Sequence, residues 1–322
     1  MASFAVIKRE MTFYNALVIS VCVADAVTIA YDGSVMGSLN VMPSYTSYFN
    51  LNHATTAVNS CATSIGAILV GPLVPMFTDG YGRKVGIYAA YIINIIGAII
   101  AGAAQNIAMF IAGRMIIGVA FAFAQTAASA YVAETTTAGI RAFALGLYYS
   151  CWAIGGILAA SISYGISDSI SILQDKCRLV RKTSALDPST WAWRIPTLFQ
   201  GVFPIIAMGI LYFVPESPRW LAYQDRPEKA LRVLCMIGGR DETDPSIQLQ
   251  YREIIDTIQF EKTGGRSLGL RECVRTPSNR KRFTLAVTMA LLTMLTGSNI
   301  ITYVPIVSSS AVSWAFRVGV DC

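Results

Sequence analysis

Ionisable side chains are scarce in this sequence. Asp, Glu, Lys and Arg make up 14% of its 322 residues, against about 25% in an average soluble domain. His53 is the single histidine, and the seven cysteines are too far apart in sequence to form a Cys-x-x-Cys pair. These absences indicate no metal site, no cofactor, no disulfide framework and no nucleic-acid binding. No nucleophile–base set is present either, so we do not expect an enzyme.

Long apolar blocks are what the sequence has instead. Apolar residues make up 54% of the chain, and the mean hydropathy is +0.52. A soluble domain of this composition would expose large apolar patches. Each block approaches the ~20 residues with which a helix crosses a bilayer. The sequence therefore predicts an all-α membrane protein with seven spans, at about 14–36, 54–78, 85–105, 107–127, 142–165, 195–214 and 283–304.

The charge that is present is concentrated and alternates along the chain. About half of it lies in residues 216–282, which predicts a cytoplasmic helical segment. Short cytoplasmic loops are rich in Lys and Arg, and such residues flank alternate spans, at Lys8, Arg9, Arg83, Lys84 and Arg141. We therefore expect a plasma-membrane protein with a cytoplasmic N-terminus. The loop 166–194 breaks this pattern, because it should lie outside yet carries Lys176, Arg178, Arg181, Lys182 and Arg194.

The segment 216–282 carries signals for two helices. Asp225 can cap a helix that has Pro227 in its first turn and ends at Gly238 and Gly239. A second helix begins near Pro245, and its apolar face consists of Ile247, Tyr251, Ile254, Ile255 and Ile258. We expect both helices to pack against the cytoplasmic ends of the spans.

Three ionisable groups fall inside predicted spans, namely Asp25, Asp32 and Arg114. Such a group is costly in a bilayer, so it normally faces a cavity or a partner. Asp25 and Asp32 are seven residues apart, which places both on roughly the same side of the first span. An Asp32–Arg114 pair would neutralise both charges, and protonation of Asp32 would free Arg114, as a proton-driven switch requires. The alternatives are a purely structural ion pair and an Asp32 at the membrane interface.

Opposite charges recur at three predicted cytoplasmic ends. The sets are Asp79 with Arg83 and Lys84, Glu134 with Arg141, and Glu216 with Arg219. They are either the ordinary charges that orient spans or a network that holds one conformation closed. In the last span, Asn299 is either a helix–helix hydrogen bond or a ligand contact. Small residues in the spans favour close helix packing, among them Gly97, Gly102, Gly113, Gly118, Gly155 and Gly156.

In chain order, several motifs resemble those of the sugar porter family of the major facilitator superfamily, and in particular its fungal lactose-permease-like and hexose symporter group. They are YDGSVMG at 31–37, DGYGRK at 79–84, GR at 113–114, YVAE at 131–134 with Arg141, WRIP at 193–196 with Gln200, PESPRWL at 215–221 and GSNIITY at 297–303. The most specific of these is PESPRWL. The sequence departs from many relatives at Met294 and Tyr149, where they carry amides, and at Val304, where they carry a tyrosine.

The resemblance implies a secondary active transporter, a proton-coupled symporter of a mono- or disaccharide that works by alternating access. Asp32 would carry the proton and be coupled to Arg114. Asn299, Tyr149 and Tyr303 would contact the sugar. The conformational charge network would comprise Asp79, Arg83, Lys84, Glu134, Arg141, Glu216 and Arg219. The partners would be sugar, protons and the lipid bilayer.

The expected organisation is a six-helix membrane half at 1–214 with an atypical outside insertion at 168–190. A cytoplasmic helical segment at 215–282, a seventh span at 283–305 and an atypical tail at 306–322 follow. Because the family has twelve spans, we expect the chain alone not to transport, and we attribute both atypical segments to a gene-model or splicing fault. The alternatives are a genuinely short protein, a non-transporting sensor or pseudo-transporter of the same fold, and a seven-span receptor. A receptor of that class would place its N-terminus outside.

Overall fold

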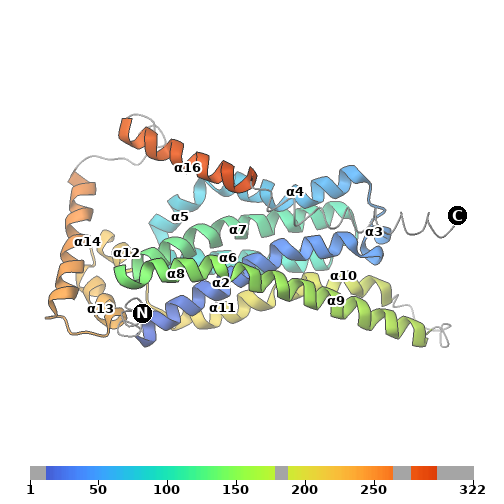
Figure 1. Cartoon of the computed structure of the whole chain (residues 1–322), viewed down its shortest axis with the longest axis horizontal. Coiled ribbons are helices and arrows are strands. Elements are labelled where there is room, and N and C mark those ends of the chain that lie inside the picture. The colour runs from blue at the N-terminus through green and yellow to red at the C-terminus, as the bar shows by residue number, and fades with distance from the viewer. Residues whose placement is uncertain (1–11, 178–187, 264–276, 296–322) are drawn as a thin grey trace. The chain divides into compact units, whose positions relative to one another are not determined.

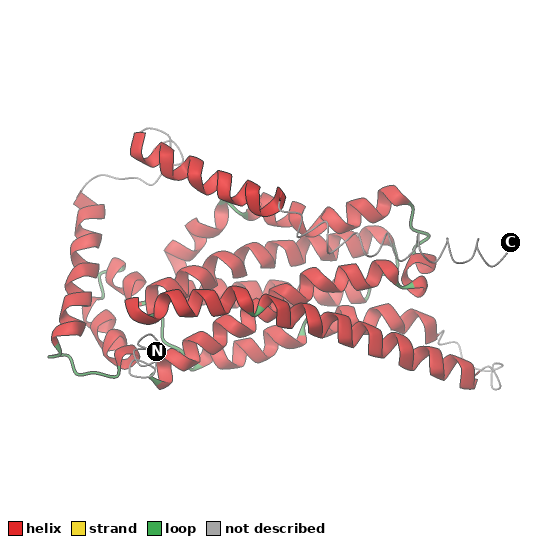
Figure 2. Ribbon diagram, viewed as in Figure 1, coloured by secondary structure: helices red, strands yellow, loops and turns green. Residues whose placement is uncertain are grey.

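The computed structural model describes residues 12–177, 188–263 and 277–295, and every regular element in these ranges is an α-helix (Figure 2). Contacts within the chain divide it into two units, Met1–Ile255 and Asp256–Cys322. The predicted domain boundaries at 214 and 282 are not tested by this division and stay predictions. The predicted tail at 306–322 lies outside the described residues.

The first unit is built around a bundle of helices (Figure 1). Within it α6 and α4 pack against α7, and α2 packs against α9 and α11. The largest apolar core lies between α2, α6, α7, α8 and α11, where Tyr91, Tyr131 and Tyr148 are buried. In chain order these helices are α2 (Phe13–Val41), α3 (Pro43–Tyr48), α4 (His53–Val70), α5 (Leu73–Tyr81), α6 (Arg83–Gly102), α7 (Ile107–Thr135), α8 (Ala138–Ser150), α9 (Trp152–Cys177), α10 (Pro188–Phe199) and α11 (Val202–Tyr212).

Five of the described stretches are long and apolar enough to cross a membrane, and a bent helix pair makes a sixth. They coincide with the first six predicted spans. Large apolar side chains stay exposed on the outside of the bundle, as on Ile68, Leu69 and Met76, which suits a surface that faces lipid. The seventh predicted span begins within α16 (Pro277–Leu295), and the rest of it lies outside the described residues.

The second span is a bent pair rather than one straight helix. The axes of α4 and α5 differ by 57° across a break at Gly71 and Pro72. Proline has no N–H to donate into the preceding turn, and its ring clashes with the carbonyl four residues back. The prediction of one continuous span at 54–78 missed this bend.

The predicted loop at 166–194 was wrong at both ends. Helix α9 continues past residue 165 to Cys177, and α10 already begins at Pro188. The guanidinium of Arg194 lies 5.2 Å from the ring centre of Trp193 and 5.8 Å from that of Tyr48. Its charge is therefore accommodated by aromatic faces at the end of the bundle. Arg178, Arg181 and Lys182 lie outside the described residues.

The charged segment forms short helices, as predicted. They are α12 (Pro218–Tyr223), α13 (Pro227–Gly238) and α14 (Pro245–Thr263). The predicted cap at Asp225 was wrong: the N-cap of α13 is Arg226, and Asp225 has a φ of 55° in the turn that reverses the chain after α12. Gly239 ends α13 with a φ of 61°, as the sequence predicted. Ile247 and Ile258 of the predicted α14 stripe are buried.

Candidate functional site

A cluster of polar side chains lies inside the bundle, centred on Arg114 of α7. Both terminal nitrogens of Arg114, Nη1 and Nη2, donate to the main-chain carbonyl of Asp32 on α2, each at 3.3 Å. With its amide oriented to satisfy both neighbours, Gln200 accepts from Arg114 Nη1 at 3.2 Å and donates to the Thr197 carbonyl at 3.3 Å. Arg114 thus links the first, fourth and sixth spans.

The carboxylate of Asp32 has a different partner. Its Oδ2 accepts a hydrogen bond from the side-chain amide of Asn94 on α6. Its Oδ1 has no hydrogen-bond partner among the described residues. The structure brings Asp32 and Arg114 together as predicted, but the guanidinium meets the carbonyl of Asp32 rather than its carboxylate. Both side chains are buried inside the bundle, so they face other helices rather than lipid or water.

Asn94 was missed by the sequence analysis. It stands between isoleucines on both sides within the third span, where an isolated amide is costly unless it is hydrogen-bonded. The same signal drew attention to Asn299. Applied to the third span, it would have predicted that Asn94 serves a buried polar partner.

Arg83 is the centre of a second cluster, at the end of the bundle where α12 packs against α7. Its Nε donates to both carboxylate oxygens of Glu134, at 3.2 and 3.0 Å, and its Nη2 donates to Oε1 at 3.0 Å. Its Nη1 forms an ion pair with Asp79 at 2.7 Å and donates to the Thr78 carbonyl at 3.1 Å. Planar guanidinium groups favour such multiple bonds to carboxylates.

The residues before and within α12 complete this second cluster. Ser217 donates to Glu134 Oε2 at 2.5 Å. Glu216 Oε1 accepts from the backbone N–H groups of Lys84 and Ser217, each at 3.0 Å. Lys84 Nζ in turn donates to the carbonyl of Val214 at 2.6 Å. Burial raises the pKa of Glu216 above its ordinary value, and these backbone N–H groups partly offset that rise.

One predicted pairing of the network, that of Glu134 with Arg141, is replaced by others. Glu134 binds Arg83 and Ser217, whereas Arg141 donates to the Thr136 carbonyl at 3.5 Å. Glu216 binds the backbone of Lys84, and Arg219 is exposed on α12. The i,i+4 pair of Asp79 and Arg83 forms as sequence proximity suggested. Glu134 and Glu216, in contrast, bind groups that lie far away in the sequence.

Of the three predicted sugar contacts, the structure describes one. Tyr149 lies on α8 with 57% of its side chain exposed, next to the buried Tyr148. Asn299 and Tyr303 lie outside the described residues. Among those described, no group of three or more His, Cys, Asp or Glu side chains is placed to hold a metal ion.

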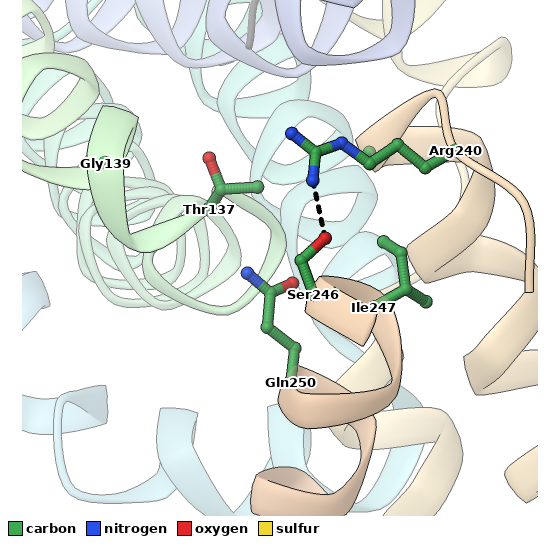
Figure 3. Close-up of a pocket in the computed structure, with 7 residues that line it drawn as sticks. Thr137, Gly139, Arg240, Ser246, Ile247 and Gln250 are labelled. Atoms are coloured by element: carbon green, nitrogen blue, oxygen red, sulfur yellow. Dashed lines mark hydrogen bonds between the residues drawn. The ribbon is translucent and has the colours of Figure 1, made fainter. Parts of the chain in front are cut away.

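A small cavity of about 150 Å³ opens at the turn between α7 and α8. Figure 3 shows Arg240 extending toward Ser246 across it, and its Nη1 donates to Ser246 Oγ at 2.6 Å. Asp244 neutralises the same guanidinium at 3.7 Å and caps the backbone of Ser246 at 2.9 Å. Arg240, Ser246 and Asp244 thus bind one another at the edge of the cavity. Its lining comprises Thr137, Gly139, Gly238, Arg240, Ser246, Ile247 and Gln250.

Residues 17–311 match the family model described as "Sugar (and other) transporter". The chain belongs to the sugar transporter family. It is 29% identical over 299 residues to a high-affinity glucose transporter of Kluyveromyces lactis, covering 92% of this chain and 51% of the relative. It is 31% identical over 279 residues to the MFS glucose transporter mfs1 of Aspergillus flavus, covering 85% and 50%. The chain thus spans about half the length of these relatives.

Other relatives of the chain carry different descriptions. A high glucose sensor of Saccharomyces cerevisiae is 27% identical over 264 residues, covering 80% of this chain and 32% of the sensor. The fold is similar to that of the proton:xylose symporter XylE from E. coli bound to 6-bromo-6-deoxy-D-glucose. That match has a TM-score of 0.66 and 22% identity, and covers 79% of this chain and 55% of the symporter. The predicted fold, that of a multi-pass major facilitator protein, is confirmed.

Proposed function

We propose that this chain is the N-terminal part of a proton-coupled sugar transporter and that Asp32 is its proton carrier. The observation that carries the proposal is the buried carboxylate of Asp32, whose Oδ1 is left without a hydrogen bond beside the guanidinium of Arg114. A buried acid with a spare oxygen and a nearby cation can take up and release a proton at modest cost. Because Arg114 and Asn94 lie on other spans, the change in the charge of Asp32 alters the contacts between these spans and the first span.

The link between protonation and movement is electrostatic. While Asp32 is ionised, its negative charge attracts Arg114, and its carboxylate accepts a hydrogen bond from Asn94. These two interactions hold α2, α6 and α7 together. Protonation removes that charge and its attraction for Arg114, while the bonds of Arg114 to the Asp32 carbonyl and Gln200 remain. The contacts of the first span with its neighbours weaken, and the equilibrium between conformations shifts. Asp32 and Arg114 together thus form the coupling site.

The second cluster acts as a lock at the cytoplasmic end. Asp79, Arg83, Lys84, Glu134 and Glu216 join α5, α6 and α7 to the segment before α12, and they hold this end closed. Arg141 and Arg219 lie at the border of the lock. Loops rich in Lys and Arg place this end, and with it the N-terminus, in the cytoplasm of a cell whose plasma membrane carries the protein.

The substrate class that fits is a mono- or disaccharide. Relatives of the chain are described as glucose transporters, and a structural relative was solved with a glucose analogue. Tyr149, which is exposed on α8, is proposed as one sugar contact, and Asn299 and Tyr303 are proposed as further contacts. The organisation proposed with it is a membrane half at 1–214, a cytoplasmic segment at 215–282 and a further span at 283–305.

Replacing Asp32 by Asn tests the coupling role. The test uses the full-length transporter of which this chain is proposed to be the N-terminal part. The amide keeps the shape and the acceptor but cannot carry a proton, so concentrative uptake of labelled glucose or xylose should be lost in transporter-deficient cells. Exchange of labelled for unlabelled sugar should persist, because it needs no net proton movement. The matched control, Asp241→Asn on an exposed turn, should accumulate sugar like the parent protein. Concentrative uptake by Asp32→Asn would remove Asp32 from the coupling role.

A glucose sensor is the second candidate, because one relative carries that description. A sensor binds sugar without moving it, so the two functions separate in one pair of measurements. Membranes that carry a sensor would retain labelled glucose in an equilibrium binding assay, yet whole cells would take up none. Saturable uptake by the cells would exclude the sensor and leave the transporter.

A further inference from the structure

A second carboxylate, that of Asp25, lies two turns before Asp32 on α2 and plays no part in the proposed function. Its side chain is fully buried. It lies within the largest core of the bundle, among apolar side chains of α2, α7, α8 and α11. An acid at such a position is costly, and its protonation state is fixed by the hydrogen bonds around it.

Two phenol hydroxyls lie at this carboxylate, those of Tyr148 on α8 and Tyr91 on α6. The Tyr148 hydroxyl on α8 lies 3.3 Å from Asp25 Oδ2 and also 3.3 Å from Gln125 Oε1 on α7. A phenol carries one proton. If Asp25 is ionised, Tyr148 can donate either to Asp25 or to Gln125, and Tyr91 is a further donor that faces the anion. If Asp25 is a neutral acid, it donates to the Tyr148 oxygen, which donates to Gln125, so the two acceptors no longer compete for one proton and no unpaired charge is buried in the core.

The charged and titratable groups around Asp25 also favour a neutral acid. Cys22 of the same helix, Tyr91 of α6 and Tyr148 of α8 are the titratable groups that face Asp25. Asp32 lies further along the same helix and adds a like charge when ionised. Within the described part of the chain, no Lys or Arg forms an ion pair with Asp25. An anion at this position would lack the cation that buried carboxylates normally require.

We propose that Asp25 is a second proton-binding site of this protein. Its carboxylic acid stays neutral while α2, α7 and α8 are closed around it, and it releases the proton when these helices separate and admit water. The O–H bond of the carboxylic acid breaks and the proton passes to a water molecule, which leaves a solvated carboxylate and a hydronium ion. The placement of the proton rests on the Tyr148–Gln125 hydrogen-bond chain, whereas its use in transport rests on the proposed function.

Infrared spectroscopy of the purified protein tests the proton directly. A protonated carboxylic acid has a C=O stretch that a carboxylate lacks, and at neutral pH exposed acids are ionised. The Asp32→Asn protein should keep this band at neutral pH, and the Asp25→Asn/Asp32→Asn double variant should lose it. Glu216 and every other acid are common to both proteins and cancel in the difference. Identical spectra for the two proteins would overturn the proposal.

The Tyr148→Phe variant tests the hydrogen-bond chain separately. Without the phenol oxygen, the acid of Asp25 loses its acceptor, so its C=O band should shift to higher frequency. Tyr149→Phe removes the hydroxyl of the neighbouring residue, which is 57% exposed, and should leave the band in place. If the frequency of the band stayed the same in both variants, the hydrogen bond between Asp25 and Tyr148 would be contradicted. Because Asn can also donate a hydrogen bond to Tyr148, the Asp25→Asn protein should fold. The infrared test does not measure sugar uptake, so its failure can be distinguished from a failure of the proposed transport function.

Discussion

At the scale of single residues, the protein places its few charges where the fold can satisfy them. Arg114 has a carbonyl and an amide oxygen as acceptors, and the Asp32 carboxylate has Asn94 as its donor. A buried charge without such partners costs several kcal/mol, roughly as much as the whole stability of a small domain. Each of these residues therefore depends on partner groups from at least one other span.

Glu134 provides a residue-scale prediction. Its side chain is 11% exposed and joins Arg83 and Ser217, whereas Asp79 is 59% exposed and joins only the edge of Arg83. Glu134→Gln removes the charge from a partly buried, multiply bonded pair and should lower the free energy of unfolding by about 1.5–3 kcal/mol. Asp79→Asn changes an exposed pair and should cost about 1 kcal/mol or less. Thermal unfolding of the purified variants checks the order, and an equal loss in both would contradict it.

At the scale of helices, close backbone approach decides which spans are neighbours. A methyl group on Gly118 of α7 would overlap the main-chain carbonyl of Thr63 on α4. Small residues allow such contacts in membranes, where packing rather than the hydrophobic effect drives helix association. The bend at Gly71 and Pro72 belongs to the same scale, because it redirects α5 relative to α4 by 57°.

The Gly118→Ala variant tests that packing against a matched control. The added methyl has no room between α4 and α7, so the variant should lose about 1–3 kcal/mol of stability. Gly146 on α8 has no heavy atom within 4 Å of an added Cβ. Gly146→Ala should therefore be neutral or gain up to about 1 kcal/mol from helix propensity. The midpoints of thermal unfolding compare them, and a tolerated Gly118→Ala would show that the helices separate easily.

At the scale of the first unit, polar contacts at one end tie the spans to the segment before α12. Glu216 is half-buried between the start of α6 and the start of α12, and Tyr131 of α7 donates to the Pro215 carbonyl at 2.5 Å. These contacts must all break if this end opens during alternating access. Opening would also expose Glu216 to water, which links the conformational change to pH.

The pH dependence of stability tests that link. Burial raises the pKa of Glu216 in the folded protein, so the folded state keeps a proton that the unfolded chain has already released. This contribution is fully present below the ordinary range of Glu, about pH 4.3, and is lost as pH rises through the folded pKa. Relative to Glu216→Gln, the wild type should therefore lose thermal stability as pH rises. If the wild type instead became increasingly more stable than Glu216→Gln as pH rises, the expected sign would be wrong. The control is Glu242→Gln, on an exposed turn.

The sequence determined much of this protein. Apolar block lengths gave the first six spans, and ordered motifs such as PESPRWL gave the family, because both depend on local composition and spacing. The isolated charges at Asp32 and Arg114 could also be predicted to meet, since a membrane interior leaves them few partners.

Only the tertiary structure decided which atoms meet. Arg114 binds the Asp32 carbonyl, Asn94 serves the carboxylate, and Glu134 pairs with Arg83 rather than with Arg141. The role proposed for Asp25 depends on Tyr148 and Gln125, which the fold brings to it from two other helices. The physical reason is that helix formation is local, whereas the partner of a buried polar atom depends on how helices far apart in sequence are rotated and bent against one another.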